Sequence, residues 1–162
     1  MTTQLVWIDV VPPLRSGQQK RLVRMGDRWG MVQNRGYEAA MQGLVAVLYQ
    51  HRPAGWIPLA SPVVVGIYLY SPHTASTPQR DRGRVLPMGV TPDWDNIAKL
   101  YGDALTRAGW VVDDKLITVG TIAKRRSPRA GIGLLLRPDT CAGDPPEFLR
   151  AAAGRMDGGR DD

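Results

Sequence analysis

The chain is poor in residues that cross-link or bind soft metals. Its 162 residues include one cysteine, Cys141, and two histidines, His51 and His73. A single cysteine cannot close an internal disulfide, and none of these three residues has the spacing of a zinc site. A disulfide-stapled scaffold and a thiolate–imidazole zinc centre are therefore excluded. We assign these three residues no role and expect a reducing, cytoplasmic setting.

Long apolar runs are also lacking. None approaches the roughly 18 residues of a membrane span. The apolar stretch at residues 5–8 is followed by Asp9 and lacks the charged-then-apolar order of a signal peptide. Hydrophobic residues make up 43% of the chain, which suits one compact core rather than two. We expect a soluble, unexported protein with no membrane contact.

Acidic residues are in the minority, with 15 against 21 basic residues and a formal charge of +6. Residues 139–162 hold three arginines against six acidic residues, so the part before them carries an excess of about nine positive charges. This excess favours a polyanionic partner, although a merely soluble basic protein has the same balance. We predict a folded domain over residues 1–138 and a poorly ordered acidic tail, rich in Gly, Pro and Ala, over 139–162.

Apolar spacing predicts two helices with one buried stripe each. The residues recur at i, i+3, i+4 and i+7 over 37–48 and again from Asp95 to Ala108, where Gly109 suits the C-cap. β-branched and aromatic residues predict strands at 5–11, 63–70, 116–124 and 132–137. This order predicts an α+β fold, with a small mixed or antiparallel sheet of about four strands and two helices packed on it.

Two segments between these elements have no clear period. Residues 14–36 are basic and contain several glycines, which predicts a flexible basic loop or a loose hairpin. Residues 71–92 contain several prolines and a group of arginines, which predicts an exposed excursion.

Acidic residues gather on either side of the second predicted helix. Asp93 and Asp95 stand two apart in an extended lead-in, so their side chains can point the same way. Asp113 and Asp114 open the next strand, and the short turn before them can bring Asp114 toward the first pair. Close carboxylates demand a cation, and a ligand set of oxygens suits Mg²⁺, with Mn²⁺ as a substitute, rather than zinc.

The same acids also have a purely structural interpretation. Asp95 or Asn96 is suited to cap the free N–H groups of the helix, and the later acidic pair suits a polar turn. Lys99 and Asp103 follow Asp95 on the polar face of the helix. Lys99 can contact a phosphate or form a solvated pair with a carboxylate. Spacing alone leaves the catalytic and the structural interpretation open.

The complete segment is similar to a known motif. Residues 92–99 read PDWDNIAK, residues 103–105 read DAL, residues 109–114 read GWVVDD, and Lys124 follows at the end of a predicted strand. This pattern resembles the signature of the RusA family of Holliday junction resolvases, and a weaker likeness covers most of residues 5–137. Trp94, the excursion and the acidic tail depart from the family's pattern.

The resemblance implies a RusA-like fold and a Mg²⁺-dependent endonuclease that resolves four-way DNA junctions in recombination and repair. It implies a homodimer that makes paired, symmetric cuts. By the same resemblance, Asp93, Asp95 and Asp114 would hold the metal and Lys99 would act beside them. The supporting positions of the motif are Asn96, Asp103 and Asp113.

Basic residues outside the central motif predict phosphate contacts, with a solvated surface as the alternative. They are Arg15, Lys20, Arg21, Arg24, Arg28, Arg35, Lys124, Arg125 and Arg126. Two further functions stay open. A non-catalytic module that binds branched DNA would need the basic loops but not the acids. A phosphohydrolase of small molecules would need the acids but not a basic surface spread over several loops.

Overall fold

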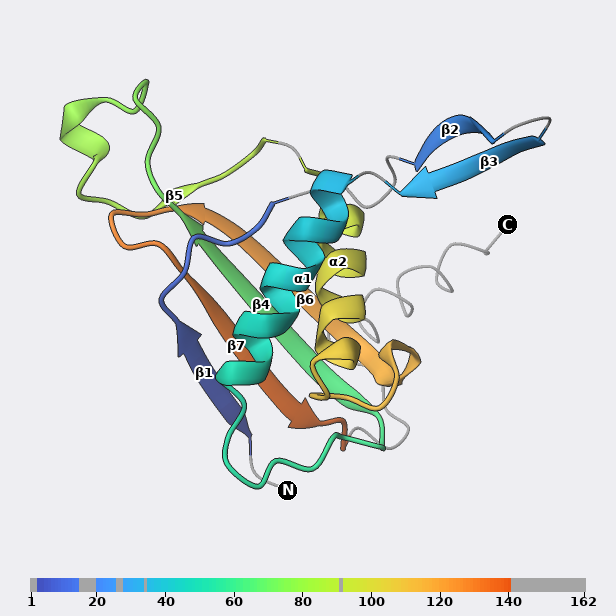
Figure 1. The fold of residues 1–162 in the computed structure, drawn as a ribbon. Coiled ribbons are helices and arrows are strands. Elements are labelled where there is room, and N and C mark those ends of the chain that lie inside the picture. The colour runs from blue at the N-terminus through green and yellow to red at the C-terminus, as the bar shows by residue number, and fades with distance from the viewer. Residues whose placement is uncertain (1–2, 15–19, 26–27, 34, 91, 141–162) are drawn as a thin grey trace, which may run out of the picture.

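The computed structural model describes residues 3–14, 20–25, 28–33, 35–90 and 92–140. In this part of the chain a five-stranded sheet carries two α-helices on one face (Figure 1). The strands are β1 (Gln4–Ile8), β4 (Val63–Ser71), β5 (Leu86–Pro87), β6 (Ile117–Arg126) and β7 (Gly131–Pro138), and the helices are α1 (Arg35–Gln50) and α2 (Trp94–Arg107). The predicted α+β fold is confirmed, and the short β5 is the strand that the sequence did not indicate.

The sheet is mixed and has the order β1-β7-β4-β6-β5. Its central strand, β4, pairs antiparallel with β7 and parallel with β6. A parallel pair cannot be joined by a hairpin, so the chain needs a long crossover between the two strands. The excursion and α2 form this crossover. Helix α2 therefore begins near the ends of β4 and β6 and runs back toward their starts (Figure 1).

The core lies between the sheet and the two helices. Alternate residues of β4, such as Val63, Ile67 and Leu69, are at most 5% exposed and belong to one cluster with the apolar stripes of α1 and α2. Trp110 is fully buried, and its Nε1 donates to the Leu48 carbonyl at 3.0 Å. This bond ties the chain after α2 to the end of α1.

The opposite face of the sheet carries apolar side chains together with Arg125 and Arg137, which pair in register with Tyr70 and Val64, and no helix of the described residues covers it (Figure 1). We call it the open sheet face. Trp7, Gly133 and Tyr68 stand in one row across three strands, and the rings of Trp7 and Tyr70 lie 5.3 Å apart. Its larger apolar side chains are Leu5, Trp7, Val64, Tyr68, Tyr70, Val119 and Leu135. Leu5 is 74% exposed and Val119 is 47% exposed, so part of this face stands open to solvent.

Two segments project from the body at the end where α2 begins (Figure 1). The predicted basic loop or hairpin forms a hairpin of β2 (Lys20–Met25) and β3 (Arg28–Gln33). The predicted excursion contains a 3₁₀ turn, η1 (Gln79–Asp81), and is mostly exposed. Arg82 stiffens it by donating to the carbonyls of Thr77 and Ala75, each at 3.1 Å.

The ends of β1 and α2 can be compared with the bounds predicted from the sequence. Strand β1 ends at Ile8, three residues before the predicted end, because the Val10 N–H turns back to the Ile8 carbonyl at 3.0 Å. The second helix ends at Arg107 with Ala108 as its C-cap, so Gly109, the predicted C-cap, lies one residue later, at φ +70°. None of the described helices is both long and apolar enough to cross a membrane.

Gly109→Ala is expected to lower the free energy of unfolding by about 2 kcal/mol, through backbone strain and lost hydrogen bonds. A Cβ there would lie 2.5 Å from Arg52 Nη1, which donates to the carbonyls of Ala108 and Gly109. Gly55 is the matched control, because its φ is +72° and no atom lies within 4 Å of an added Cβ. Gly55→Ala should cost only about 1 kcal/mol. Urea unfolding measures both, and equal losses would show that the Arg52 contact adds nothing.

Candidate active site

The first two predicted ligands stand at the start of α2. Asp93 is the N-cap residue, with φ −66° and ψ 160°, and its carbonyl accepts the Ile97 N–H at 3.2 Å. Its side chain makes no capping hydrogen bond. Asp95 lies in the first helical turn, so the prediction that Asp95 or Asn96 caps the helix is wrong. Both carboxylates are exposed, and the positive end of the helix dipole favours negative charge there.

Asn96 differs from its neighbours because it is buried. Only 8% of it is exposed, and its side-chain Oδ1 has no hydrogen-bond partner. A buried oxygen without a partner costs about 1–3 kcal/mol, so native structures rarely retain one without a reason. Asn96, next to Asp95 in the chain, thus carries a buried oxygen that accepts no hydrogen bond from a described residue.

Lys99 and Asp103 follow on the same side of α2. Lys99 is exposed and forms no ion pair with any described residue, whereas Asp103 is partly buried. Burial raises the pKa of the Tyr37 hydroxyl on α1, and the negative charge of Asp103 raises it further. Asp103 thus lies near the contact between the two helices, whereas Lys99 is exposed on the surface of α2.

The second acidic pair lies at the start of η2, a 3₁₀ turn over Asp114–Leu116. Asp113 caps this turn by accepting the Lys115 N–H at 3.0 Å, and it pairs with the Lys115 ammonium at 2.8 Å. The hydrogen bonds from Lys115 lower the pKa of Asp113. Asp113 therefore has a structural partner, while the neighbouring Asp114 is exposed.

Asp114 lies against the middle of α2. A Cβ built on Gly102 would come within 3.7 Å of the Asp114 Cβ. Gly102 is seven residues after Asp95, which places it about 10 Å farther along the helix axis. Glycine inside a helix costs about 1 kcal/mol relative to alanine, so Gly102 was a sequence signal for a close approach that we did not use.

The three predicted ligands are thus not gathered: Asp93 and Asp95 stand at the start of α2, and Asp114 lies beside its middle. Among the residues that the structure describes, no group of three or more His, Cys, Asp or Glu side chains could hold a metal ion. The available donors are all oxygens, which fits Mg²⁺ or Mn²⁺ in ligand chemistry. Joint metal binding by Asp93, Asp95 and Asp114 stays a prediction.

Lys124 lies on β6 and contacts the segment that leads into α2. Its Nζ donates to the carbonyls of Val90 and Pro92, both at 2.8 Å. Its own carbonyl accepts the Met88 N–H at 3.2 Å. Sequence reasoning treated Lys124 as a phosphate contact and missed these bonds, because no local pattern indicates which carbonyl a distant lysine meets.

The other predicted basic contacts differ in their surroundings. Arg125 Nη1 donates to the Lys124 carbonyl and Arg126 Nη1 to the Pro72 carbonyl, each at 2.9 Å. Arg28 is exposed at the start of β3. Arg15 lies outside the described residues, and so do the side chains of Lys20, Arg21, Arg24 and Arg35.

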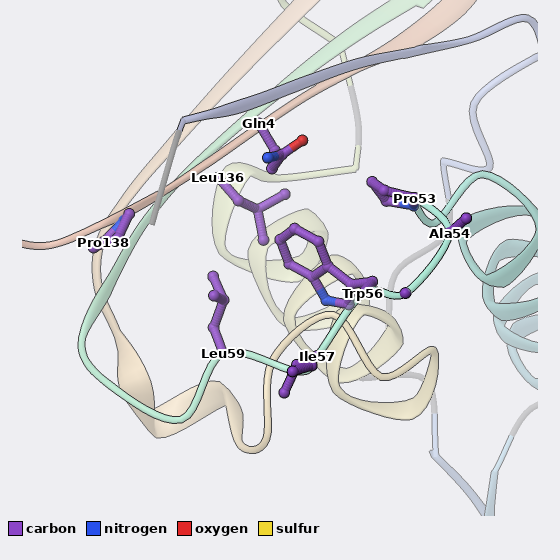
Figure 2. Close-up of a pocket in the computed structure, with 9 residues that line it drawn as sticks. Gln4, Pro53, Ala54, Trp56, Ile57, Leu59, Leu136 and Pro138 are labelled. Atoms are coloured by element: carbon purple, nitrogen blue, oxygen red, sulfur yellow. The ribbon is translucent and has the colours of Figure 1, made fainter.

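A pocket of about 310 Å³ lies elsewhere, beside Trp56 (Figure 2). It is lined by Gln4, Pro53, Ala54, Gly55, Trp56, Ile57, Leu59, Leu136 and Pro138. None of these side chains is ionisable. Pro138 pairs with Val63 at the beginning of β4, whereas Lys124 pairs with Leu69 near its end. The pocket is therefore at the other end of the sheet from the start of α2 and supplies no acid–base group.

Comparison with known proteins identifies one family. The model of the family "Endodeoxyribonuclease RusA" matches residues 11–136. This range includes both helices, the strands β2 to β6 and both acidic pairs. The comparison with curated proteins gives no match.

Asn96→Leu should raise the free energy of unfolding by about 1 kcal/mol in metal-free buffer, because it removes an unpaired buried oxygen. Asn96→Leu should also reduce the rise in Tm that Mg²⁺ or Mn²⁺ causes in the wild type, because it removes an oxygen that has no partner among the described residues and is available to the cation. Tyr101→Phe is the control. It removes another buried unpaired oxygen of α2 and should keep the full metal response. A loss of more than about 2 kcal/mol for Asn96→Leu would instead mean that the amide has a structural partner.

Proposed function

The chain belongs to the RusA family of endodeoxyribonucleases, and we propose that it resolves four-way DNA junctions by paired, symmetric, Mg²⁺-dependent cuts. Recombination and DNA repair are the processes that need this reaction. The observation that carries the proposal is the pair of exposed carboxylates, Asp93 and Asp95, at the start of a helix within the segment that the family model matches.

In this proposal Asp93, Asp95 and Asp114 are the ligands of the divalent cation. A bound cation supplies activation of water and stabilisation of the leaving oxygen. The chain's own contribution is to carry Asp93 and Asp95 at the start of α2 and Asp114 beside its middle, with Lys99 one turn after Asp95 and in no ion pair with a described residue. An ammonium at that position offsets negative charge that develops on the phosphate.

Basic side chains on the projecting segments support DNA as the substrate. The side chains of Arg80 and Arg84 in the excursion are 87% and 72% exposed, and Arg28 is exposed on the hairpin. Both segments project at the end of the molecule where α2 begins (Figure 1). Phosphates that met these arginines would lie on the same side as the carboxylates, and binding would weaken with salt.

Paired cutting requires two active sites, and we propose that two copies join through the open sheet face. The four longer strands β1, β7, β4 and β6, about 4.8 Å apart and on average about eight residues long, cover roughly 500 Å², so two copies would bury about 1,000 Å², near the lower limit for a specific interface. Aromatic residues and arginine are enriched at such interfaces. Tyr68 and Tyr70 lie on the central strand β4 and Trp7 on the edge strand β1, and the Arg129 guanidinium lies 5.2 Å from the Trp7 ring.

Incubation with a synthetic four-way junction and a matched linear duplex tests the function. We expect symmetric nicks in the junction alone, with Mg²⁺ and not with EDTA. Asp93→Asn or Asp95→Asn should abolish the cuts and leave junction binding intact, because losing negative charge does not weaken attraction to phosphate. Glu38→Gln is the matched control, since Glu38 pairs with Arg107 away from these acids. Binding without cuts would favour a non-catalytic module, and cleavage of small phosphate esters alone would favour a phosphohydrolase.

Val119→Glu should convert the dimer to a monomer, because it buries a charge in the proposed interface. Light scattering across a range of protein concentrations measures the mass. Ile57→Glu is the control. It adds the same charge at an exposed apolar residue, 72% exposed, on the rim of the Trp56 pocket, and it should leave the dimer intact. A wild type that is monomeric at every concentration would refute the paired-site proposal.

A further inference from the structure

Lys124 on β6 connects the segment before Asp93 and Asp95 to the sheet. Lys124 contributes two side-chain hydrogen bonds of 2.8 Å, to the carbonyls of Val90 and Pro92. Its main chain contributes a third bond, from the Met88 N–H at 3.2 Å. These bonds span the residues directly before the N-cap, Asp93.

The position of Lys124 in the sheet explains why it can do this. It pairs in register with Leu69, which is buried in the core on the helix side. The lysine stem therefore starts on the face that α2 covers, and only a long side chain reaches the loop above it. An ammonium has three donors, and two of them are used within the chain.

We propose that Lys124 is a positioning residue for the candidate active site: it fixes the backbone before α2, so that the carboxylates of Asp93 and Asp95 are presented to the metal. This inference rests on the proposed function, and it replaces the predicted role of Lys124 as a phosphate contact. Residues that orient ligands in this way matter, because each loose degree of freedom at the site lowers its affinity for the ion.

The alternative role makes opposite predictions. A lysine that contacts phosphate contributes to junction affinity and to its salt dependence, and its loss reduces the salt slope by about one. If Lys124 instead holds the residues before α2 in place, its loss leaves junction affinity and the salt dependence of that affinity unchanged. Its loss then alters metal binding and the protection of nearby backbone amides from hydrogen exchange. The two roles can therefore be separated without measuring cleavage.

The test compares Lys124→Met, which keeps the stem and removes the donors, with Lys124→Arg, which retains donors. Arg80→Met serves as the phosphate-contact comparator, and Arg107→Met removes a basic charge at the far end of α2. Three properties are measured on the full chain: amide hydrogen exchange in residues 88–98, terbium binding through terbium emission sensitised by tryptophan, and junction affinity in EDTA at several salt concentrations. Trp94→Phe identifies the emission that comes from beside the site.

For Lys124→Met we expect faster exchange in residues 88–98 and terbium affinity lowered about tenfold. Junction affinity and its salt slope should stay within about twofold of the wild type, whereas Arg80→Met should lower both. Lys124→Arg should recover part of the protection and part of the terbium affinity. Arg107→Met should match the wild type in exchange and terbium binding.

Two results would overturn the inference. One is a Lys124→Met protein with wild-type exchange and terbium affinity but weaker, less salt-dependent junction binding. The second result applies if Lys124→Met fails to fold. It is a folded Lys124→Arg protein whose amides in residues 88–98 exchange as fast, and whose terbium affinity is as low, as in Pro92→Gly, a variant that disturbs the backbone before α2. A wild type that never cuts junctions would refute the proposed function, and the exchange experiment would still decide the role of Lys124.

Discussion

The parallel pairing of β4 with β6 is the constraint on which the arrangement of the site depends. A parallel neighbour requires a crossover, and here the crossover contains the excursion and α2. The helix must return along the strands, so its first turn, with Asp93 and Asp95, lies near the ends of β4 and β6. The same return places η2 near the start of β6. The Asp114 side chain can therefore approach Asp93 and Asp95 only along the surface of α2. Gly102, which has no side chain, leaves space for Asp114 there.

The one-sided packing of the sheet is the second organising feature. Both helices bury the face that holds Val63, Ile67 and Leu69, so the opposite face of the same strands has no partner among the described elements. A sheet face exposed to water normally alternates with polar residues. Here β4 presents Val64, Tyr68 and Tyr70 instead, and the rings fold over glycines of the neighbouring strand, such as Gly133. An apolar face of this kind is consistent with burial in an assembly.

Sequence reasoning succeeded where local spacing determines structure. The apolar period predicted both helices, the β-branched run predicted β4, and Gly109 marked the end of α2, because each depends on neighbours within a few residues. It failed where distant segments meet. Nothing near Asp93 indicated that this residue, rather than Asp95 or Asn96, would start the helix, and nothing near Lys124 pointed to the carbonyls of Val90 and Pro92. Those contacts depend on strand register, which is set by pairings across the whole chain.

The separation of the three carboxylates follows from electrostatics. Like charges on exposed side chains repel one another, and Asp93, Asp95 and Asp114 are all exposed to solvent. Assembly of a metal site then requires changes in side-chain rotamers, which are cheap for exposed residues, or movement of the backbone, which costs about 1–2 kcal/mol for each residue that must be ordered. If Lys124 orders the backbone before α2 as we propose, through its hydrogen bonds to the carbonyls of Val90 and Pro92, Asp93 and Asp95 need only the cheaper kind of change. A lysine on the sheet can thus decide how tightly a site on the helix binds its ion.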